Sequence, residues 1–256
     1  MFKSIIAIVF YLISNHSYAK IEINRKVEIL ARTFPMGGFS KFSLEAISPL
    51  WGTKERKNDI SYGFTGAQLE YRTSAVVNYI SGKVFIYPIP ILGIFIGQES
   101  GIKQLEKIDT FDCTTSLCKG KMQRQFTGFR LALGYKNFFF MSESKWSKIT
   151  AGDDQLPFVD EMTTLLGKPG QDQSFIGLNI LGLNLDDNKK LGFIYITNEM
   201  KKRTSNSKML SLFFEKSWSN HSLISSAGIF QTRESQKIGT LLLLYRWKSP
   251  SNLRLF

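Results

Sequence analysis

One of the two histidines is the first candidate for chemistry in this chain of 256 residues. His16 lies in the leading segment, which leaves His221 as the only histidine in the rest of the sequence. A Ser-His-acid hydrolase needs such a residue to take the proton from its serine. His221 stands between Asn220 and Ser222 in a turn-type cluster, where a solvated polar side chain is the usual occupant. The sequence therefore assigns no catalytic residue and predicts a protein that is not an enzyme. A lipid-modifying hydrolase built on His221 is the alternative.

The two cysteines, Cys113 and Cys118, are the next candidates. In an oxidising compartment so close a pair ordinarily forms a disulfide. A metal site is the alternative, but it needs further His, Cys or carboxylate ligands, and no histidine lies nearby in the sequence. We expect a disulfide that pins a loop tip.

Acidic residues form a loose run after residue 148, at Asp153, Asp154, Asp160, Glu161 and Asp172. Carboxylates can bind Ca²⁺, but this spacing fits no EF-hand-like loop. The glycines lack the lysine and the strand-to-helix context of a phosphate-binding loop. We therefore expect a solvated loop, no metal site and no cofactor.

The elements that position these residues are strands. Phe129, Leu131, Leu133 and Tyr135 alternate with small or polar residues, which is the two-residue period of a strand with one apolar face. The same period recurs over residues 60–64, 67–71, 176–180, 210–214 and 241–247. Turn-type clusters separate these runs, and no run of comparable length has a helical period. The sequence predicts an all-β, antiparallel meander.

Twelve strands account for this pattern. Ten is the alternative, because the first pair is irregular near residues 51–59. The expected ranges are 21–31, 39–50, 60–72, 75–87, 91–98, 123–136, 138–148, 174–185, 191–199, 208–218, 222–231 and 238–247.

The start of the chain predicts export. Lys3 precedes an apolar run from Ile5 to Ile13, and small residues end the segment at Ala19, as in a cleaved signal peptide. The run is too short to span a bilayer as a helix, since about 20 residues are needed. We expect residues 1–19 to be removed and residues 20–256 to form one domain. The formal charge of +12 then points to anions of the cell envelope, and we expect no nucleic-acid partner.

Three features favour a closed transmembrane barrel over a soluble periplasmic β protein. The strands are long enough to cross a bilayer at a tilt. Aromatic residues such as Tyr135, Trp218 and Trp247 lie near strand ends, where an interfacial girdle would hold them. Short and long connections alternate, as do the periplasmic turns and external loops of such barrels. The sequence predicts a single up-and-down transmembrane β-barrel.

The end of the chain resembles the C-terminal signal of bacterial outer-membrane β-barrel proteins. The last strand ends in Tyr245, Arg246 and Trp247, and the chain itself ends in Phe256, although Pro250 separates that residue from the strand. The resemblance is to a broad class and names no family. It implies the outer membrane of a Gram-negative bacterium and, during biogenesis, the barrel assembly machinery as a partner.

In a barrel whose large apolar residues face lipid, the alternate positions face the lumen. We expect Gln68, Glu70, Arg72, Arg130, Asn179 and Glu215 there, with Glu143 and Lys145 also inside. Charges of both signs can pair into a network that fills the interior. Alternatively, they line a narrow pore in which Arg72 and Arg130 give a weak preference for anions.

Basic residues outside the strands suggest a lipid partner. Lys201, Lys202 and Arg203 lie in a predicted external connection, where they would meet lipopolysaccharide phosphates or simply be solvated. The sequence thus predicts a non-enzymatic outer-membrane barrel, acting as a surface or structural protein or as a narrow porin-like channel. It leaves the solute and the oligomeric state open.

Overall fold

The computed structural model describes residues 21–51, 62–74, 76–104, 111–153 and 155–249. The expected signal peptide, its cleavage after Ala19, Asp154 and the terminal Phe256 lie outside these residues. Within the described ranges no helix is long and apolar enough to cross a membrane.

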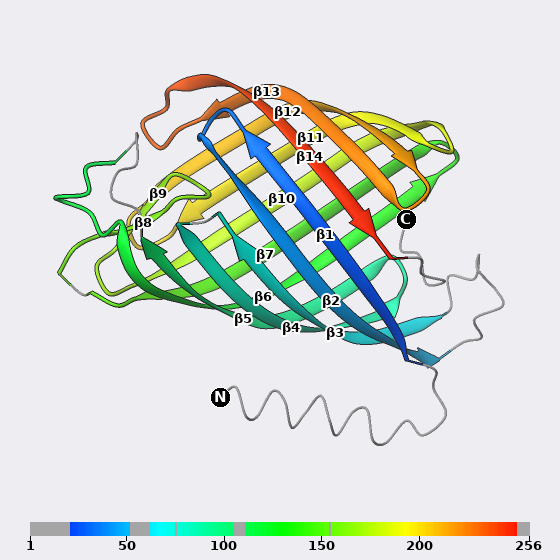
Figure 1. Ribbon diagram of the computed structural model, residues 1–256, viewed down its shortest axis with the longest axis horizontal. Helices are drawn as coiled ribbons and strands as arrows, with labels where there is room; N and C mark the ends of the chain where they lie inside the picture. The colour runs from blue at the N-terminus through cyan, green and yellow to red at the C-terminus, as the bar shows by residue number, and fades with distance from the viewer. Residues whose placement is uncertain (1–20, 52–61, 75, 105–110, 154, 250–256) are drawn as a thin grey trace.

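Twelve antiparallel strands close into one barrel in the order β1-β14-β13-β12-β11-β10-β7-β6-β5-β4-β3-β2. Apart from the β7–β10 pair and the closing β1–β14 pair, each strand hydrogen-bonds to its neighbour along the chain. A separate two-stranded sheet, β8-β9, lies in the connection between β7 and β10 (Figure 1). The prediction of a twelve-stranded up-and-down barrel is confirmed, and the ten-strand alternative is wrong.

The barrel strands are β1 (Glu22–Arg32), β2 (Gly37–Trp51), β3 (Gly63–Thr73), β4 (Val77–Ile89), β5 (Leu92–Gln104), β6 (Lys119–Tyr135), β7 (Phe138–Ala151), β10 (Gln171–Asp186), β11 (Lys189–Met200), β12 (Ser205–Trp218), β13 (His221–Gln231) and β14 (Lys237–Lys248). The two short strands are β8 (Phe158–Asp160) and β9 (Leu165–Gly167).

The strands expected from the sequence leave residues 99–122 as a loop. This prediction is partly wrong, because β5 and β6 extend into the segment from both sides. Glu99, Gly101 and Lys103 continue the inward-facing alternation of β5, and Glu99 lies opposite Arg124 in the register of β6. Polar residues of this kind are typical of a loop, which is why the sequence predicts one. They fit a strand because the face that carries them points into a polar interior.

The two ends of the barrel differ. Connections of two residues, such as 136–137, 187–188 and 219–220, lie at the end where β1 begins and β14 finishes. The longest described connection, between β7 and β10, lies at the other end (Figure 1). We call these the short-turn end and the long-loop end. Barrels of this class place short turns in the periplasm and longer loops outside the cell.

The outer face is apolar along most of the barrel. Large hydrophobic side chains are exposed on every barrel strand, among them Ile29, Leu44, Ile94, Leu212 and Leu243. Trp218, Tyr135 and Phe138 add exposed aromatic rings at the short-turn end. In water this surface would be an apolar patch far larger than soluble monomers carry. It therefore argues for a lipid-facing exterior and against the soluble alternative.

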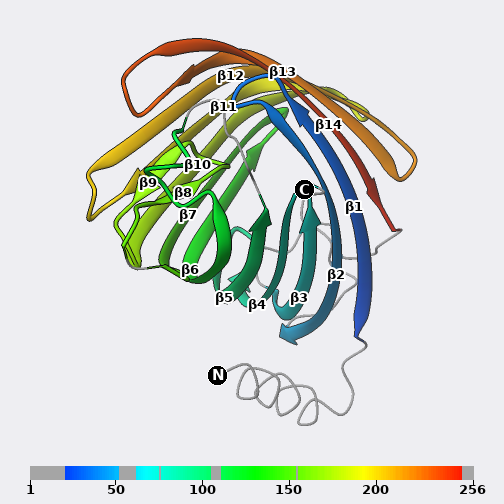
Figure 2. The same cartoon turned by 60° about the vertical axis from the view of Figure 1, so that its left-hand side comes forward.

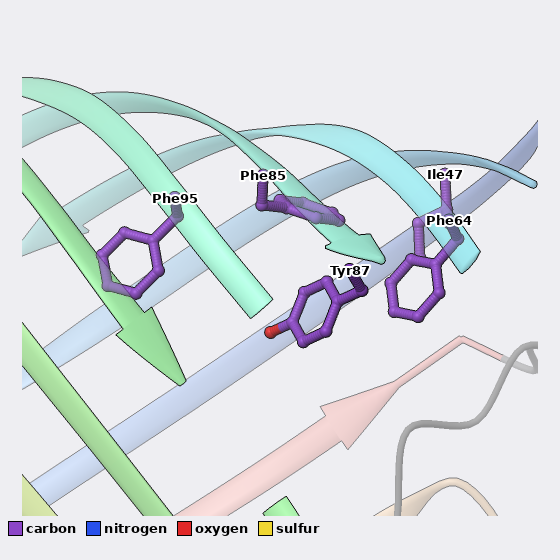
Figure 3. Packing of buried hydrophobic residues seen from close by; sticks show 5 residues of the cluster. All are labelled: Ile47, Phe64, Phe85, Tyr87 and Phe95. Carbon is purple, nitrogen blue, oxygen red and sulfur yellow. The ribbon is translucent and has the colours of Figure 1, made fainter. Parts of the chain in front are cut away.

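Part of the inner face is an aromatic cluster near the short-turn end. Figure 3 shows Ile47, Phe64, Phe85, Tyr87 and Phe95 from β2 to β5, all buried. The rings of Phe64 and Tyr87 stack with their centroids 4.6 Å apart. Tyr87 lies against Gly93, where an added Cβ would come within 2.3 Å of the ring. The glycine thus lets the ring lie flat on the wall instead of projecting across the interior.

The lipid-facing exterior predicts a depth-dependent cost for charge. Leu243 is exposed near the middle of β14 and lies opposite Ala31 of β1. Replacing Leu243 with Arg should lower the free energy of unfolding by about 2–4 kcal/mol, because the charge enters the hydrocarbon region. Urea titration of the barrel folded into lipid vesicles measures the change. Asn206→Arg, at an exposed position near the long-loop end, is the control and should cost less than half as much. Equal costs at the two positions would contradict a lipid-facing Leu243.

Candidate functional site: a lumen crossed by an inward-folded hairpin

The interior of the barrel has two unlike walls. The wall made by β1 to β7 carries most of the inward charges. Inward positions of β10 and β11 carry instead Ile176, Leu178, Ile180, Ile194 and Ile196, which pair across the two strands or with β7 and β12. In the closed strand order β10 and β11 stand six places from β2 and β3, directly across the barrel. A mainly apolar wall therefore faces a charged one.

Basic side chains outnumber acidic ones on the inward face, even when Asp160 and Glu161 of the connection between β7 and β10 are added. The inward basic residues are Lys26, Arg32, Lys41, Arg72, Lys83, Lys103, Arg124, Arg130, Lys145, Lys190, Arg246 and Lys248, and the inward acidic residues are Glu22, Glu28, Glu45, Glu70, Glu99, Glu143, Asp172 and Glu215.

Water reaches the charged wall at mid-height. Arg130 and Glu143 lie opposite each other on β6 and β7 and form an ion pair, with Arg130 Nε 2.8 Å from Glu143 Oε2. Their side chains are nonetheless 33% and 22% exposed. On β1, which lies five places from β6 in the ring and on the other side of the barrel (Figure 2), Glu28 forms ion pairs with Lys26, Lys41 and Arg246. The charges on this wall are paired, and the Arg130–Glu143 pair remains partly exposed.

The long-loop end is different, because a hairpin folds into it. Residues 155–170, which include β8 and β9, form what we call the plug hairpin. The Tyr79 hydroxyl on β4 donates to Glu161 at 3.1 Å, and the Ser207 hydroxyl on β12 donates to the Thr163 carbonyl at 2.7 Å. Strands β4 and β12 are six places apart in the ring. The plug hairpin therefore reaches both walls and crosses the lumen.

A row of ion pairs holds the plug hairpin on the charged wall. Asp160 lies 3.1 Å from Arg124, and Arg124 lies 3.2 Å from Glu99, which pairs in turn with Arg72 at 3.3 Å. Only 6% of the Arg124 side chain and 3% of the Asp160 side chain is exposed. Beside this row, Lys103 pairs with Glu161 at 3.0 Å and donates to the Val159 carbonyl. Charges buried this deeply are stable only when paired and hydrogen-bonded in this way.

Apolar packing and the disulfide loop complete the docking. Phe158 and Leu165 of the plug hairpin are buried against Met122, Ile149 and Met200 on the barrel wall. The hairpin also gains a neighbour from the connection between β5 and β6, because the Leu117 amide donates to the Pro157 carbonyl at 2.8 Å. Cys113 and Cys118 are joined by a disulfide in that connection. The disulfide therefore closes the loop that braces the plug hairpin.

Asp172 fixes the end of the plug hairpin. Its carboxylate is fully buried and accepts hydrogen bonds from the amides of Lys168 (2.9 Å), Gln173 (2.6 Å) and Lys202 (2.9 Å). The hairpin end and the turn after β11 are thus tied to one side chain. The expectation of a solvated acidic loop is wrong for Asp160 and Asp172. A loop is solvated by default, and only the interior cations and amides of the folded barrel make burial of these carboxylates favourable.

Most of the predicted lumen residues lie on the inner face. The register places Gln68, Glu70 and Arg72 on the inner side of β3, Arg130 on that of β6 and Glu215 on that of β12. Their role in selectivity stays a prediction.

Asn179 is a correction. It lies on the outer face of β10, where its side chain accepts a hydrogen bond from Ser142 at 2.9 Å. The sequence suggested that the apolar residues of this strand face lipid. Leu181 and Leu183 do lie outside with Asn179, but Ile176, Leu178 and Ile180 lie inside. The strand is apolar on both faces, so its pattern could not reveal which face pointed inward.

Of the remaining predicted positions, the three basic residues are exposed and His221 is half-buried. Lys201, Lys202 and Arg203 form the turn after β11 at the long-loop end. His221 begins β13 on the outer face, where its Nδ1 lies 2.7 Å from the Tyr245 hydroxyl and its ring stacks with Trp218. In the described part of the chain no three His, Cys, Asp or Glu side chains gather into a possible metal site.

Four residues that dock the plug hairpin are not predicted from the sequence: Tyr79, Glu99, Lys103 and Arg124. Tyr79 lay in a predicted strand, and the same alternation rule places it inside. The sequence pattern was weaker for Glu99 and Lys103, because both lay in an expected loop. Only the register with β6 assigns them to the lumen.

These features define a transmembrane β-barrel of the bacterial outer-membrane type, with a hairpin folded into its lumen. No protein-family model matches the chain, and no curated protein matches its sequence. Three solved structures that are similar to this barrel are distant from it in sequence. A bacterial polysaccharide outer-membrane secretin is 8% identical, with a TM-score of 0.46 over 91% of this chain and 98% of that one.

Two further structures are similar at the same level. An outer-membrane channel from Pseudomonas putida F1 is 8% identical, with a TM-score of 0.45 over 90% of this chain and 95% of that one. A loop-deletion mutant of OmpT, an outer-membrane protein of Vibrio cholerae, is 8% identical, with a TM-score of 0.44 over 90% of this chain and 99% of that one. At these scores the likenesses carry no functional argument.

Docking of the plug hairpin should depend on the charge of Asp160. Burial raises the pKa of Asp160, but Arg124 and Lys103 outweigh burial and hold the pKa below its ordinary value of 3.8. The ion pair therefore contributes its full stabilisation above pH 3.8 and loses it as the pH falls further toward the lowered pKa. Cleavage of the plug hairpin by pepsin, relative to cleavage of an unstructured peptide at the same pH, should increase as the pH falls below 3.8.

A neutral side chain at the same position should act like the protonated acid. At pH 7.5, Asp160→Asn should weaken docking by roughly 1–3 kcal/mol, because Arg124 loses its charged partner. Chymotrypsin cleavage at Phe158 or Leu165 measures this. Asp153→Asn is the control, because it lies in the same connection and its carboxylate accepts a hydrogen bond from the neighbouring Gln155 amide, so it should cleave like the parent. Equal cleavage of all three proteins would rule out the ion pair as the anchor.

Proposed function

We propose that this protein is a non-enzymatic channel of the Gram-negative outer membrane that admits small anionic solutes when its plug hairpin leaves the lumen. The main support for this proposal is that the exposure of the inward charges differs along the barrel axis. Charged side chains are in contact with water at mid-height, whereas the hairpin and its ion pairs are buried at the long-loop end. A purely structural barrel could fill its interior with packed side chains throughout.

The preference for anions follows from the surplus of inward basic residues. Rings of fixed cationic side chains favour anions in a pore. Arg130 is the strongest candidate for setting the preference, because it is one-third exposed within the lumen although it is paired with Glu143. Lys83 lies on β4 of the same wall and adds to the positive field at Glu143. The apolar wall of β10 and β11 would favour solutes with an apolar part.

The plug hairpin is suited to move because no covalent bond ties it to the wall. Its contacts are ion pairs, hydrogen bonds and one apolar cluster, and its two ends meet where the Ala151 amide donates to the Gly170 carbonyl at 2.9 Å. The hairpin can leave the lumen without breaking the pairing of any barrel strand, so opening it costs less free energy than opening the barrel. The ends would stay fixed while the tip left the lumen.

Planar-bilayer conductance tests the channel. Because residues 151 and 170 are adjacent, a short Gly-Ser linker can replace residues 155–168 without straining the barrel. The parent protein should show rare or small single-channel steps, and the hairpin deletion should show large, persistent steps with anion selectivity. Adding Arg130→Gln to the deletion should reduce the selectivity, whereas adding Arg203→Gln, in an exposed turn, should not. If neither the parent nor the deletion gives steps, the barrel is not a channel.

The hydrolase alternative receives no support from the position of His221. The contact of its Nδ1 is the hydroxyl of Tyr245, and its ring stacks with Trp218 in what resembles an interfacial aromatic cluster. Neither neighbour is the serine or the acid that a hydrolytic triad needs. We propose an anchoring role for His221 at the membrane surface.

We also propose lipopolysaccharide as a partner of the outer face. A groove of about 540 Å³ crosses the outer wall, with Val84, Ile96 and Trp146 along its apolar part. Lys148 and Lys201 line the same groove near the long-loop end. An acyl chain fits the apolar part, and the two cations complement a phosphate at the outer-leaflet surface.

Removing these two charges should reduce bound lipopolysaccharide. The Lys148→Gln, Lys201→Gln double variant should co-purify with at least threefold less lipopolysaccharide per barrel, because two cation–phosphate contacts are lost, each worth about 1 kcal/mol. A double variant of exposed lysines at the short-turn end, Lys189→Gln with Lys216→Gln, is the matched control. A similar amount on both double variants would mean that the groove does not select the phosphate.

A further inference from the structure

A cavity lies inside the barrel beside the plug hairpin, at the long-loop end. It has a volume of about 350 Å³ and lies between the β1–β2 turn, the start of β4 and the hairpin residues Glu161, Met162 and Thr164. This is within the size range of small-molecule sites, which start at roughly 300 Å³. Leu30, Phe34 and Phe39 give it a mainly apolar lining.

The charges around this cavity do not cancel. Arg72 lines it but pairs with Glu99, and Glu161 lines it but pairs with Lys103. Arg32 also lines it, and within the described residues it donates to two backbone carbonyls, from Nε to Pro35 at 2.8 Å and from Nη2 to Met162 at 3.3 Å.

In the described part of the chain no carboxylate lies within ion-pair distance of Arg32. The acid that acts on it from farther away, Asp160, is already paired with Arg124. A half-buried guanidinium with spare donors favours a planar anion such as a carboxylate, which it can bind through two hydrogen bonds.

The walls of the cavity are held in place before any ligand binds. In the β1–β2 turn, the Phe34 ring packs edge-on against Phe230 at 5.5 Å, and the Phe34 carbonyl accepts a hydrogen bond from the Thr240 hydroxyl at 2.6 Å. The Thr33 hydroxyl accepts a hydrogen bond from the Leu241 amide at 2.9 Å. The turn is therefore fixed to β13 and β14, and little ordering cost remains for binding.

We infer that this cavity binds a small monoanion that joins a carboxylate to an apolar body, with Arg32 taking the carboxylate and the aromatic and aliphatic lining taking the rest. The plug hairpin supplies one wall of the cavity, which includes Met162, and the Met162 carbonyl accepts a hydrogen bond from Arg32. A ligand in the cavity thus contacts the docked hairpin and stabilises it, while a docked hairpin completes the site. The site would couple the presence of such a solute to the position of the plug hairpin.

Benzoate is a suitable probe, with benzamide as its neutral counterpart of nearly the same shape. Binding to the full-length mature barrel in lipid nanodiscs can be followed by calorimetry, with empty nanodiscs to correct for partition into lipid. Benzoate should bind at least tenfold more tightly than benzamide, and Arg32→Gln should remove that difference. Arg32→Lys should restore part of it, because the charge remains but the paired donors do not.

Two further variants separate loss of the site from loss of the fold. Val77→Trp fills the cavity from β4 while Arg32 stays in place, and it should abolish benzoate binding. Arg203→Gln removes a charge from an exposed turn at the same end and should leave binding unchanged. Heat-modifiable gel mobility confirms that each variant is folded. Equal binding of benzoate and benzamide, or unaltered binding in a folded Arg32→Gln protein, would overturn the proposed site.

The coupling has its own readout. Saturating benzoate should slow chymotrypsin cleavage of the plug hairpin several-fold in the parent protein and have no effect in Arg32→Gln. If benzoate binds with the expected selectivity but gives no protection, the coupling to the hairpin is wrong. Neither experiment depends on ion flow, so a failure of the proposed channel would be distinguishable from a failure of this site.

Discussion

The pairing of β1 with β14 is the constraint on which the rest of the structure depends. Seven residue pairs from Lys26–Lys248 to Arg32–Leu242 close the sheet, so no edge strand is left. In lipid an open edge would expose backbone N–H and C=O groups with no water to satisfy them. Once the sheet is closed, each strand has one face toward lipid and one toward the lumen. The two-residue alternation then decides which side chains may be charged.

Closure also explains why the interior can be asymmetric. Lipid demands apolar residues outside, but the lumen accepts ion pairs, serines or apolar residues, provided that polar groups find partners or water. The charged wall and the mainly apolar wall of β10 and β11 use this freedom differently. The aromatic rings near the short-turn end lie flat over glycines such as Gly93, which keeps bulky side chains close to the wall. An amphipathic lumen results.

The plug hairpin depends on this asymmetry. Its acids, Asp160 and Glu161, dock on cations of the charged wall, while Phe158 and Leu165 pack on apolar residues of β6, β7 and β11. The disulfide between Cys113 and Cys118 acts at a distance, since it shapes the loop that pairs with the hairpin through Leu117. These contacts hold the hairpin at one depth and in one orientation in the barrel. Its position defines both the lumen and the cavity lined by Arg32.

The sequence by itself determined the class of fold, because alternation, strand length and turn chemistry are local properties. Twelve strands, the inward position of Arg72 and Arg130, and the close cysteine pair could all be derived from neighbours along the chain. Asn179 could not, because β10 is apolar on both faces and local alternation has no preferred direction there. Nor could the burial of Asp160, since its partner Arg124 is 36 residues away and meets it only after closure. The tertiary structure decided what lies inside the lumen, because a buried charge is stable only beside partners that distant strands supply.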